Sequence, residues 1–219
     1  RDDLMVVDNI LRQGASLEPY LDLLERDNRG ARLTIEAKAS LKPRELARLK
    51  MVGVVEMQLG IEALSDGILR RIINKGTTVL HNLQALRWMD DLGIVHIGNL
   101  IINFPGVTRA EIDDTLRNID LACAYQPLFP GEFWLGYFSP MYRLPEAFGL
   151  ERIRNRAGFD ACLPEELRER ICALGKDYDA EVPDEVREGW VQVKLRLDLA
   201  RLQYVSARKK HGVRSLLVM

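Results

Sequence analysis

The chain has 219 residues, of which 47% are hydrophobic and 29% charged, a composition typical of a globular domain with one substantial core. Its 31 lysines and arginines nearly cancel its 32 aspartates and glutamates, which argues against nucleic acid or a membrane surface as a partner. No apolar run approaches the roughly 20 residues that cross a bilayer, and residues 1–10 lack a signal-peptide pattern, so we expect a cytoplasmic protein.

The two ends of the sequence are not typical of a complete chain. It begins with Arg1 rather than methionine and enters an apolar run within three residues, and it ends inside another apolar run, VRSLLVM. We therefore expect a fragment of a longer protein.

Strand-like runs alternate with helical patterns along residues 4–138. The strands are expected at residues 4–9, 32–39, 54–59, 94–104 and 132–138. The helices are expected at residues 16–29, 42–53, 65–76, 79–93 and 108–125, with Ser16 and Thr108 as N-caps and Glu111 completing a capping box with Thr108. A spacing of roughly thirty residues between strands is typical of parallel strands joined by helical crossovers.

Units of this kind form either a barrel or an open doubly wound sheet. The sequence has no G-x-G-x-x-G after the first strand and no P-loop, which favours a barrel, complete or partial.

The pattern becomes irregular after Phe138. A loop is expected at residues 139–159 and a helix at 163–175; residues 190–202 alternate like a strand but have the length and lead-in of a helix. Residues 202–219 indicate a hairpin that turns at 210–212. We therefore divide the chain into a barrel segment, 1–139, and an α+β C-terminal extension, 140–219, with helices and a terminal hairpin.

Polar side chains gather where the expected strands end. They are Asp8, Asn9, Glu36, Lys38, Gln58, Glu62, Asn99 and Asn103. A parallel barrel brings strand ends to one rim, where carboxylates and amides could hold hydroxyls and an amine, and Lys38 and Lys75 could hold a carboxylate. This set fits a small molecule with amino-acid and ribose parts, although each residue alone could equally be a surface or capping residue.

The turn at Pro105 and Gly106 has two interpretations. It could allow the backbone to approach a flat ligand such as a base, or it could be an ordinary turn between strand and helix.

Other catalytic chemistries find little support. The three cysteines are widely spaced and odd in number, which indicates reduced thiols and no metal ligands, and the three histidines lack zinc-site spacing. No G-x-S-x-G is present. A barrel hydrolase with Glu36 and Glu62 as paired carboxylates stays open as an alternative.

Two stretches resemble radical S-adenosylmethionine (SAM) enzymes. VEMQLGIEALSDGILRRIINKGTT, residues 55–78, is similar to the family pattern G-[IV]-[EQ]-S-x-S-D-x-x-L-x-x-M-N-K-G, and IGNLIINFPGVT, residues 97–108, is similar to its strand ending F-P-G-E-T. The earlier segments TIEAKASL and VVDNIL stand in the matching order. The resemblance implies a partial TIM-like (β/α)6 radical SAM barrel.

A third stretch narrows the resemblance. EFWLGYFSPMYRLPEAFGL, residues 132–150, is similar to the R-F-S-P-Y-F-x-x-P-x-x-F-G segment of radical SAM enzymes that mature ribosomally made peptides, and residues 202–219 resemble the tail of that group. Tyr137 stands where an arginine is usual. The group usually carries a cobalamin domain upstream, so the resemblance implies a precursor peptide as substrate, C-methylation as the reaction and cobalamin as a further cofactor.

The family chemistry requires parts that these residues do not contain. A 4Fe-4S cluster, bound by a C-x-x-x-C-x-x-C loop and reduced by a donor such as flavodoxin or ferredoxin, cleaves SAM to a 5'-deoxyadenosyl radical. That loop is missing from this sequence, and we expect it, with any cobalamin domain, before Arg1. The 219 residues alone are therefore not expected to make the radical.

The resemblance also implies individual roles. Glu36 matches an acid that contacts SAM, Glu62 the residue that reaches the ribose hydroxyls, Asn99 a further ribose contact, and Lys75 the partner of the methionyl carboxylate. Asp8 and Asn9 occupy the region of the Gly-Gly-Glu motif, whose backbone receives the SAM amino group.

Three departures from the family pattern are present. One extra residue stands between Glu62 and Lys75, which in a continuous α-helix would rotate Lys75 by about 100°. Asn103 replaces a common glycine and Val107 a common glutamate. A degenerate, non-catalytic barrel that binds peptides is therefore a second alternative.

Overall fold

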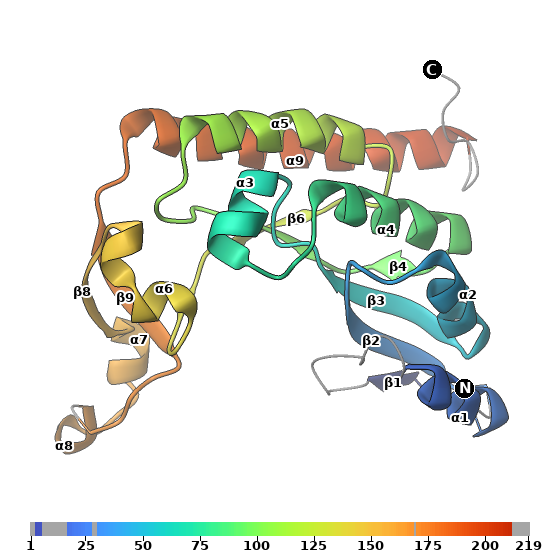
Figure 1. Cartoon of the computed structure of the whole chain (residues 1–219), viewed down its shortest axis with the longest axis horizontal. Coiled ribbons are helices and arrows are strands. Elements are labelled where there is room, and N and C mark those ends of the chain that lie inside the picture. Colours follow the sequence, from blue (N-terminus) through green and yellow to red (C-terminus); the bar gives the residue numbers. More distant parts are fainter. Residues whose placement is uncertain (1–2, 6–16, 28–29, 169, 212–219) are drawn as a thin grey trace.

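The computed structural model describes residues 3–5, 17–27, 30–168 and 170–211 (Figure 1). Strands β1 (Asp3–Met5), β2 (Arg32–Lys38), β3 (Val54–Gly60) and β4 (Val95–His96) form a parallel sheet in chain order. β5 (Asn99–Ile102) pairs in parallel with β6 (Phe129–Glu132), and a parallel bridge between Glu62 and Leu100 joins this pair to the end of β3. The strands thus follow one another as expected for part of a barrel.

The helices of this segment return the chain between parallel strands. They are α1 (Leu17–Asp27), α2 (Pro43–Met51), α3 (Asp66–Ile68), the π-helical turn η2 (Leu69–Ile73), α4 (Val79–Leu92) and α5 (Arg109–Ala122). Thr108 caps α5 in a capping box with Glu111, which confirms the expected N-terminus of this helix. Figure 1 shows α3, α4 and α5 on one side of the strands.

The two faces of the sheet differ in polarity. On β2, Leu33, Ile35 and Ala37 are buried, whereas Glu36 is half-buried and Lys38 exposed. Because side chains alternate along a strand, the apolar set packs in the core and the polar set lies on the opposite face, the inner face of a barrel. Two of the candidate residues, Glu36 and Lys38, therefore lie on this polar face.

A second sheet follows the barrel segment. β7 (Leu135–Gly136), β9 (Gly175–Ala180) and β8 (Leu150–Asn155) pair in an antiparallel sheet with β9 at the centre. Short helices connect them: α6 (Pro140–Arg143), the 3₁₀ helix η3 (Pro145–Phe148), α7 (Ala157–Asp160) and α8 (Glu165–Arg168). The last element is the long helix α9 (Asp184–His211), which runs along α5 (Figure 1).

The prediction of a terminal hairpin is wrong for its first strand. Residues 202–211, expected as a strand up to a turn, are the last turns of α9. Arg208 on this part of the helix pairs with the carboxylate of Asp90 on α4, and the Tyr204 hydroxyl donates to the same carboxylate at 3.0 Å. Packing against α4 therefore overrides the strand-like pattern, and the second expected strand lies outside the described residues.

Smaller shifts affect three other expected elements. The strand expected at 94–104 is divided into β4 and β5, and the one expected at 132–138 is replaced by β6 and β7. The helix expected at 163–175 is reduced to α8. The division of the chain at residue 139 stays a prediction, and so does Ser16 as a helix cap, because Ser16 lies outside the described residues.

None of the described helices is both long enough and apolar enough to span a bilayer.

Candidate functional site

A cavity of about 290 Å³ opens at the carboxyl ends of β3, β5 and β6. Its lining residues are Glu62, Ile72, Ile73, Lys75, Ile101, Phe104, Glu132, Phe133, Trp134, Ser139, Pro140 and Met141. The ends of parallel barrel strands are where ligands bind in barrel enzymes. The cavity combines an apolar wall with two carboxylates and one lysine, so it can hold both a flat apolar group and polar substituents.

Glu62 and Lys75 form an ion pair in the wall of this cavity. Their side chains are 20% and 47% exposed, so the pair faces the opening rather than the core. Gly60 makes room for it, because a Cβ atom there would lie 3.2 Å from Oε1 of Glu62 and 3.6 Å from Nζ of Lys75.

The backbone at Glu62 is strained. Its φ is 60°, a left-handed conformation that costs a non-glycine residue free energy and is concentrated at functional sites. This conformation follows directly after β3 and places the side chain in the cavity wall with Lys75.

The π-helical turn η2 accommodates the extra residue before Lys75. η2 covers Leu69–Ile73 and ends at Asn74, which has a left-handed backbone with φ 50°. A π turn takes one residue more than an α turn and thereby absorbs an insertion locally. The rotation of Lys75 that a continuous α-helix would impose therefore does not occur, and Lys75 reaches Glu62.

Arg71 joins η2 to the turn after β5. Its guanidinium donates to Glu111 on α5 at 2.7 and 3.3 Å and to the carbonyl of Gly106 at 2.9 Å. Gly67 allows the close approach, since a Cβ atom there would lie 2.6 Å from Oε1 of Glu111. The sequence did not indicate Arg71, because its role depends on this tertiary contact.

Glu132 is a second residue that the sequence reasoning missed. It ends β6 and accepts a hydrogen bond from Nδ2 of Asn103 at 2.7 Å. Asn103 has φ 61°, so the chain leaves regular strand geometry directly after β5, as it does at Glu62 after β3. Glu62 was identified because it is a carboxylate at a strand end. Glu132 was missed because the strand was expected to begin at residue 132, whereas β6 begins at Phe129 and ends at Glu132.

Three other predicted residues, Glu36, Lys38 and Asn99, lie on strands of the barrel segment but not in the cavity wall. Glu36 is opposite Gln58 in the pairing of β2 with β3, and Lys38 is opposite Gly60. Asn99 starts β5, and a Cβ atom on Gly131 would lie 3.2 Å from its Cβ. Asp8 and Asn9 lie outside the described residues, so their roles stay predictions.

The turn at Pro105 and Gly106 packs against protein. Pro105 is buried, and a Cβ atom on Gly106, whose φ is 69°, would lie 3.5 Å from the Phe148 carbonyl oxygen. The close backbone approach here is thus to η3, and contact with a base stays a prediction.

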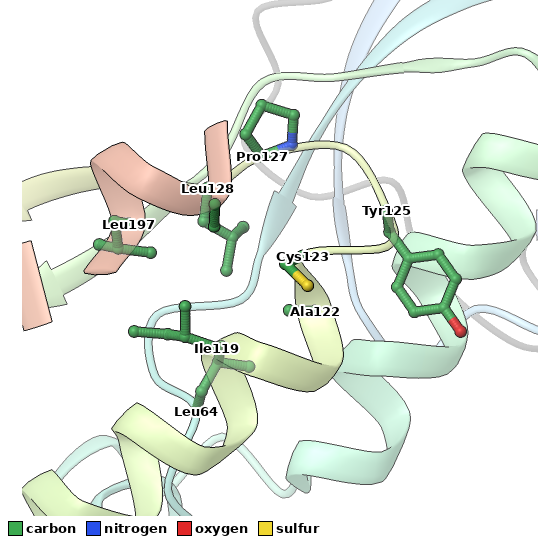
Figure 2. Close-up of a pocket in the computed structure, with 9 residues that line it drawn as sticks. Leu64, Ile119, Ala122, Cys123, Tyr125, Pro127, Leu128 and Leu197 are labelled. Carbon is green, nitrogen blue, oxygen red and sulfur yellow. The ribbon is translucent and has the colours of Figure 1, made fainter. Parts of the chain in front are cut away.

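A small apolar cavity lies elsewhere, at the end of α5. Figure 2 shows Leu64, Ile119, Cys123, Leu128 and Leu197 around it, and its volume is about 10 Å³. That volume corresponds to about one water molecule. Burial raises the pKa of the Cys123 thiol, and its Sγ donates to the Asp120 carbonyl at 2.8 Å, so this cysteine belongs to the packing of α5.

The described residues fit SAM better than they fit an iron-sulfur cluster. Gly60 leaves space beside a carboxylate and an ammonium group, which suit ribose hydroxyls and a carboxylate, respectively. No cluster of metal-ligating side chains occurs among the residues that the structure describes, and Cys123, Cys162 and Cys172 are free thiols. No 4Fe-4S ligand set can therefore be assigned within this part of the chain.

Comparisons with known structures show the fold. TsrM from Kitasatospora setae, a radical SAM methyltransferase solved with cobalamin and a [4Fe-4S] cluster, has 15% identity and a TM-score of 0.62, covering 89% of this chain and 43% of TsrM. OxsB, a cobalamin-dependent radical SAM enzyme, has 17% identity and a TM-score of 0.50, covering 58% of this chain and 20% of OxsB. Coproporphyrinogen III oxidase (HemN) from Escherichia coli has 14% identity and a TM-score of 0.51, with coverages of 86% and 38%. The chain thus spans less than half the length of each.

The chain was also compared with protein-family models and with curated proteins. No curated protein matches the chain. The model of the Radical SAM superfamily matches residues 9–119, slightly more than half of the sequence. The fold is accordingly a partial radical SAM barrel of the α/β class, which removes the basis for an unrelated barrel hydrolase. The chain belongs to the radical SAM superfamily.

Proposed function

We propose that this chain is the SAM-binding portion of a radical SAM enzyme that modifies a ribosomally made peptide by C-methylation. The observation that carries SAM binding is the ion pair of Glu62 and Lys75 in the wall of the cavity at the strand ends. The opposite charges of this pair match the opposite needs of the ribose hydroxyls and the methionyl carboxylate.

The cavity residues have distinct roles in this proposal. Glu62 accepts hydrogen bonds from the ribose hydroxyls, and Lys75 binds the methionyl carboxylate. The apolar side chains of Ile101 and Phe104 provide a surface for the adenine ring. Glu36, Asn99 and the backbone of Asp8 and Asn9 complete the polar contacts that the family pattern implies. Lys38, at the end of its strand, is a further candidate for a carboxylate.

The remaining cofactors would be held by residues outside these 219. When bound, the 4Fe-4S cluster supplies the electron that cleaves SAM, and cobalamin supplies methyl transfer. Flavodoxin or ferredoxin is the proposed electron donor, and the cytoplasm the proposed location. This part of the proposal is supported by the structures of TsrM and OxsB, which were solved with cobalamin bound, and by the fraction of their length that the chain spans.

A peptide substrate is supported by exposed aromatic side chains beside the cavity. Trp134 lines the cavity and is 53% exposed, and Phe138, four residues further along the chain, is 60% exposed. Exposed aromatic groups of this kind bind peptide side chains.

The test is SAM binding to the 219-residue chain, measured by saturation-transfer NMR, which detects weak binding without a cluster. We expect binding to the unaltered chain and about tenfold or greater weakening by Glu62→Gln, because a hydrogen bond to a charged group is worth roughly 1.5 to 3 kcal/mol. Glu166→Gln, at an exposed position on α8, is the matched control. Absence of SAM binding, or equal affinity in Glu62→Gln, would overturn the proposal. Peptide binding without SAM binding would support the non-catalytic barrel instead.

A further inference from the structure

The last helix, α9, carries apolar side chains on two opposite faces. Residues 191–199 alternate between apolar and polar, and in an α-helix residues two apart lie about 200° apart. Val193 and Leu197 are buried against the rest of the molecule. The intervening apolar residues must therefore lie on the other side of the helix.

The outward face forms a continuous apolar stripe. It consists of Val191, Leu195, Leu199 and Leu202, which are 59%, 58%, 50% and 68% exposed. Their spacing of four, four and three residues keeps them on one side of an α-helix. Among the described residues no element covers this stripe, and contiguous exposed apolar surfaces of this kind mark interaction sites.

The two ends of α9 carry opposite charges. Asp184 and Glu185 begin the helix, Lys209 and Lys210 stand near its end, and all four side chains are exposed. An antiparallel partner helix of the same sequence would therefore meet each acidic end with a basic end. A parallel partner would place like charges together at both ends.

One antiparallel register brings the apolar and the charged contacts together. Setting Leu195 of one helix against Leu199 of the other places Val191 one residue from a position directly opposite Leu202. In the same register, Asp184 and Glu185 lie beside Lys209 and Lys210 of the other copy. Two antiparallel copies of the helix thus match each other in the spacing of their apolar residues and in the charges at their ends.

We propose that the outward stripe of α9 binds the same stripe of a second copy of this chain, as an antiparallel helix pair. The contact is isologous, which means that both copies use the same surface. If one residue of the first copy contacts a second residue of its partner, that second residue of the first copy contacts the first residue of the partner. It is independent of SAM binding, because α9 contributes no side chain to the cavity at the strand ends.

The test is the mass of the 219-residue chain in solution, measured by sedimentation equilibrium over a range of concentrations. We expect a monomer–dimer equilibrium, and Leu195→Lys should raise its dissociation constant at least tenfold. Leu80→Lys is the matched control, because Leu80 is 63% exposed on α4 and away from the stripe. A monomer at all concentrations, or a dimer that Leu195→Lys leaves intact, would overturn the proposal.

The direction of pairing is tested with charge-reversed variants at low salt. Lys209→Glu with Lys210→Glu, and separately Asp184→Lys with Glu185→Lys, should each weaken the dimer, and mixing the two variants should restore it. Circular dichroism checks that each variant keeps α9. In a parallel pair, like charges face each other at both ends before and after the charge reversal, so neither variant would weaken it. Unaltered dimerisation of both variants would therefore reject the antiparallel register.

Discussion

Arg71 on η2 and Glu111 on α5 form a two-point ion pair, 2.7 and 3.3 Å long, across 40 residues of sequence. The Glu111 side chain is 11% exposed and the Arg71 side chain 44%. Glu111 also accepts hydrogen bonds from the backbone and hydroxyl of Thr108 at 2.9 and 3.0 Å. The Glu111 carboxylate thus holds the start of α5 and Arg71 of the helix that leads to Lys75, and Arg71 in turn holds the turn at Gly106.

Replacing Arg71 by methionine should destabilise the protein by about 1 to 2 kcal/mol. The change removes three hydrogen bonds and leaves a mostly buried carboxylate with fewer partners, but the exposure of Arg71 to solvent limits the loss. Urea denaturation followed by circular dichroism measures it. Arg70→Met, in the same turn, removes only one long hydrogen bond, to the Asp66 carbonyl at 3.2 Å, and should change stability by less than about 0.5 kcal/mol. Equal losses in both variants would contradict a specific role for Arg71.

Glu111 should contribute stability that disappears at low pH. Burial, the largest single effect, raises the pKa of its carboxyl, but hydrogen bonds from Thr108 and Arg71 outweigh it, and the pKa is lower than the ordinary 4.5. The stabilisation is therefore complete above about pH 4.5 and is lost as the pH falls through the lower pKa of the folded state. Denaturation at several pH values should show the advantage over Glu111→Gln shrinking below pH 4.5. An advantage that is constant with pH would contradict this assignment.

His96 should make the protein less stable in mild acid. It is 4% exposed, and burial lowers its pKa from 6.5 to about 4. The unfolded chain takes up a proton below pH 6.5 and the folded chain only below about 4, so the contribution is complete above pH 6.5 and lost between these values. Relative to His96→Leu, the protein should lose up to about 3 kcal/mol across this range. A wild-type protein whose stability varies with pH as that of His96→Leu does would contradict this assignment.

Arg208 should be important for stability although it lies near the end of the described chain. Its partner Asp90 has a side chain only 2% exposed, and removing one member of a buried pair leaves an uncompensated charge. Arg208→Met should cost about 3 kcal/mol in denaturant unfolding. Lys194→Met, at an exposed position of the same helix, should cost little. If both variants were equally stable, α9 would not depend on Asp90 for its attachment.

Gly60→Ala should weaken SAM binding while the fold is kept. The added methyl group would lie 3.2 Å from Glu62 and 3.6 Å from Lys75, so the ion pair must shift, although the backbone of Gly60 allows alanine. Affinity should fall several-fold in the same NMR titration. Gly158→Ala is the matched control, because a Cβ atom there meets nothing within 4 Å. Unchanged affinity in Gly60→Ala would show that the ligand does not use this pair.

Local signals in the sequence predicted part of the fold correctly. The capping box of Thr108 and Glu111 and the strands around Glu36 and Gln58 are confirmed, because capping chemistry and apolar alternation act within a few residues. The helix α9 was ambiguous because its outward leucines imitate a strand pattern. Packing of the buried face on α5 and of Arg208 on Asp90 decides its conformation, and neither contact is visible in a local window.

The candidate site was predicted in the same uneven way. Glu62 and Lys75 were identified from the family pattern, and the structure brings them together. Arg71 and Glu132 were missed, because Arg71 acts through a carboxylate 40 residues away and Glu132 through Asn103 on the neighbouring strand. Contacts of this kind depend on strand register, which the sequence does not specify for β6.

The π-helical turn lets the segment between Asp66 and Val79 change in length without moving its ends. The Asp66 carboxylate accepts a hydrogen bond from the backbone of Val79 at 2.8 Å, so the start of α3 is tied to the start of α4. Asn74, in its left-handed conformation, closes the turn just before Lys75. A chain one residue shorter here could present the same lysine with an ordinary α turn. Motif searches that fix the number of residues between this glutamate and lysine would therefore miss sites with the same ion pair.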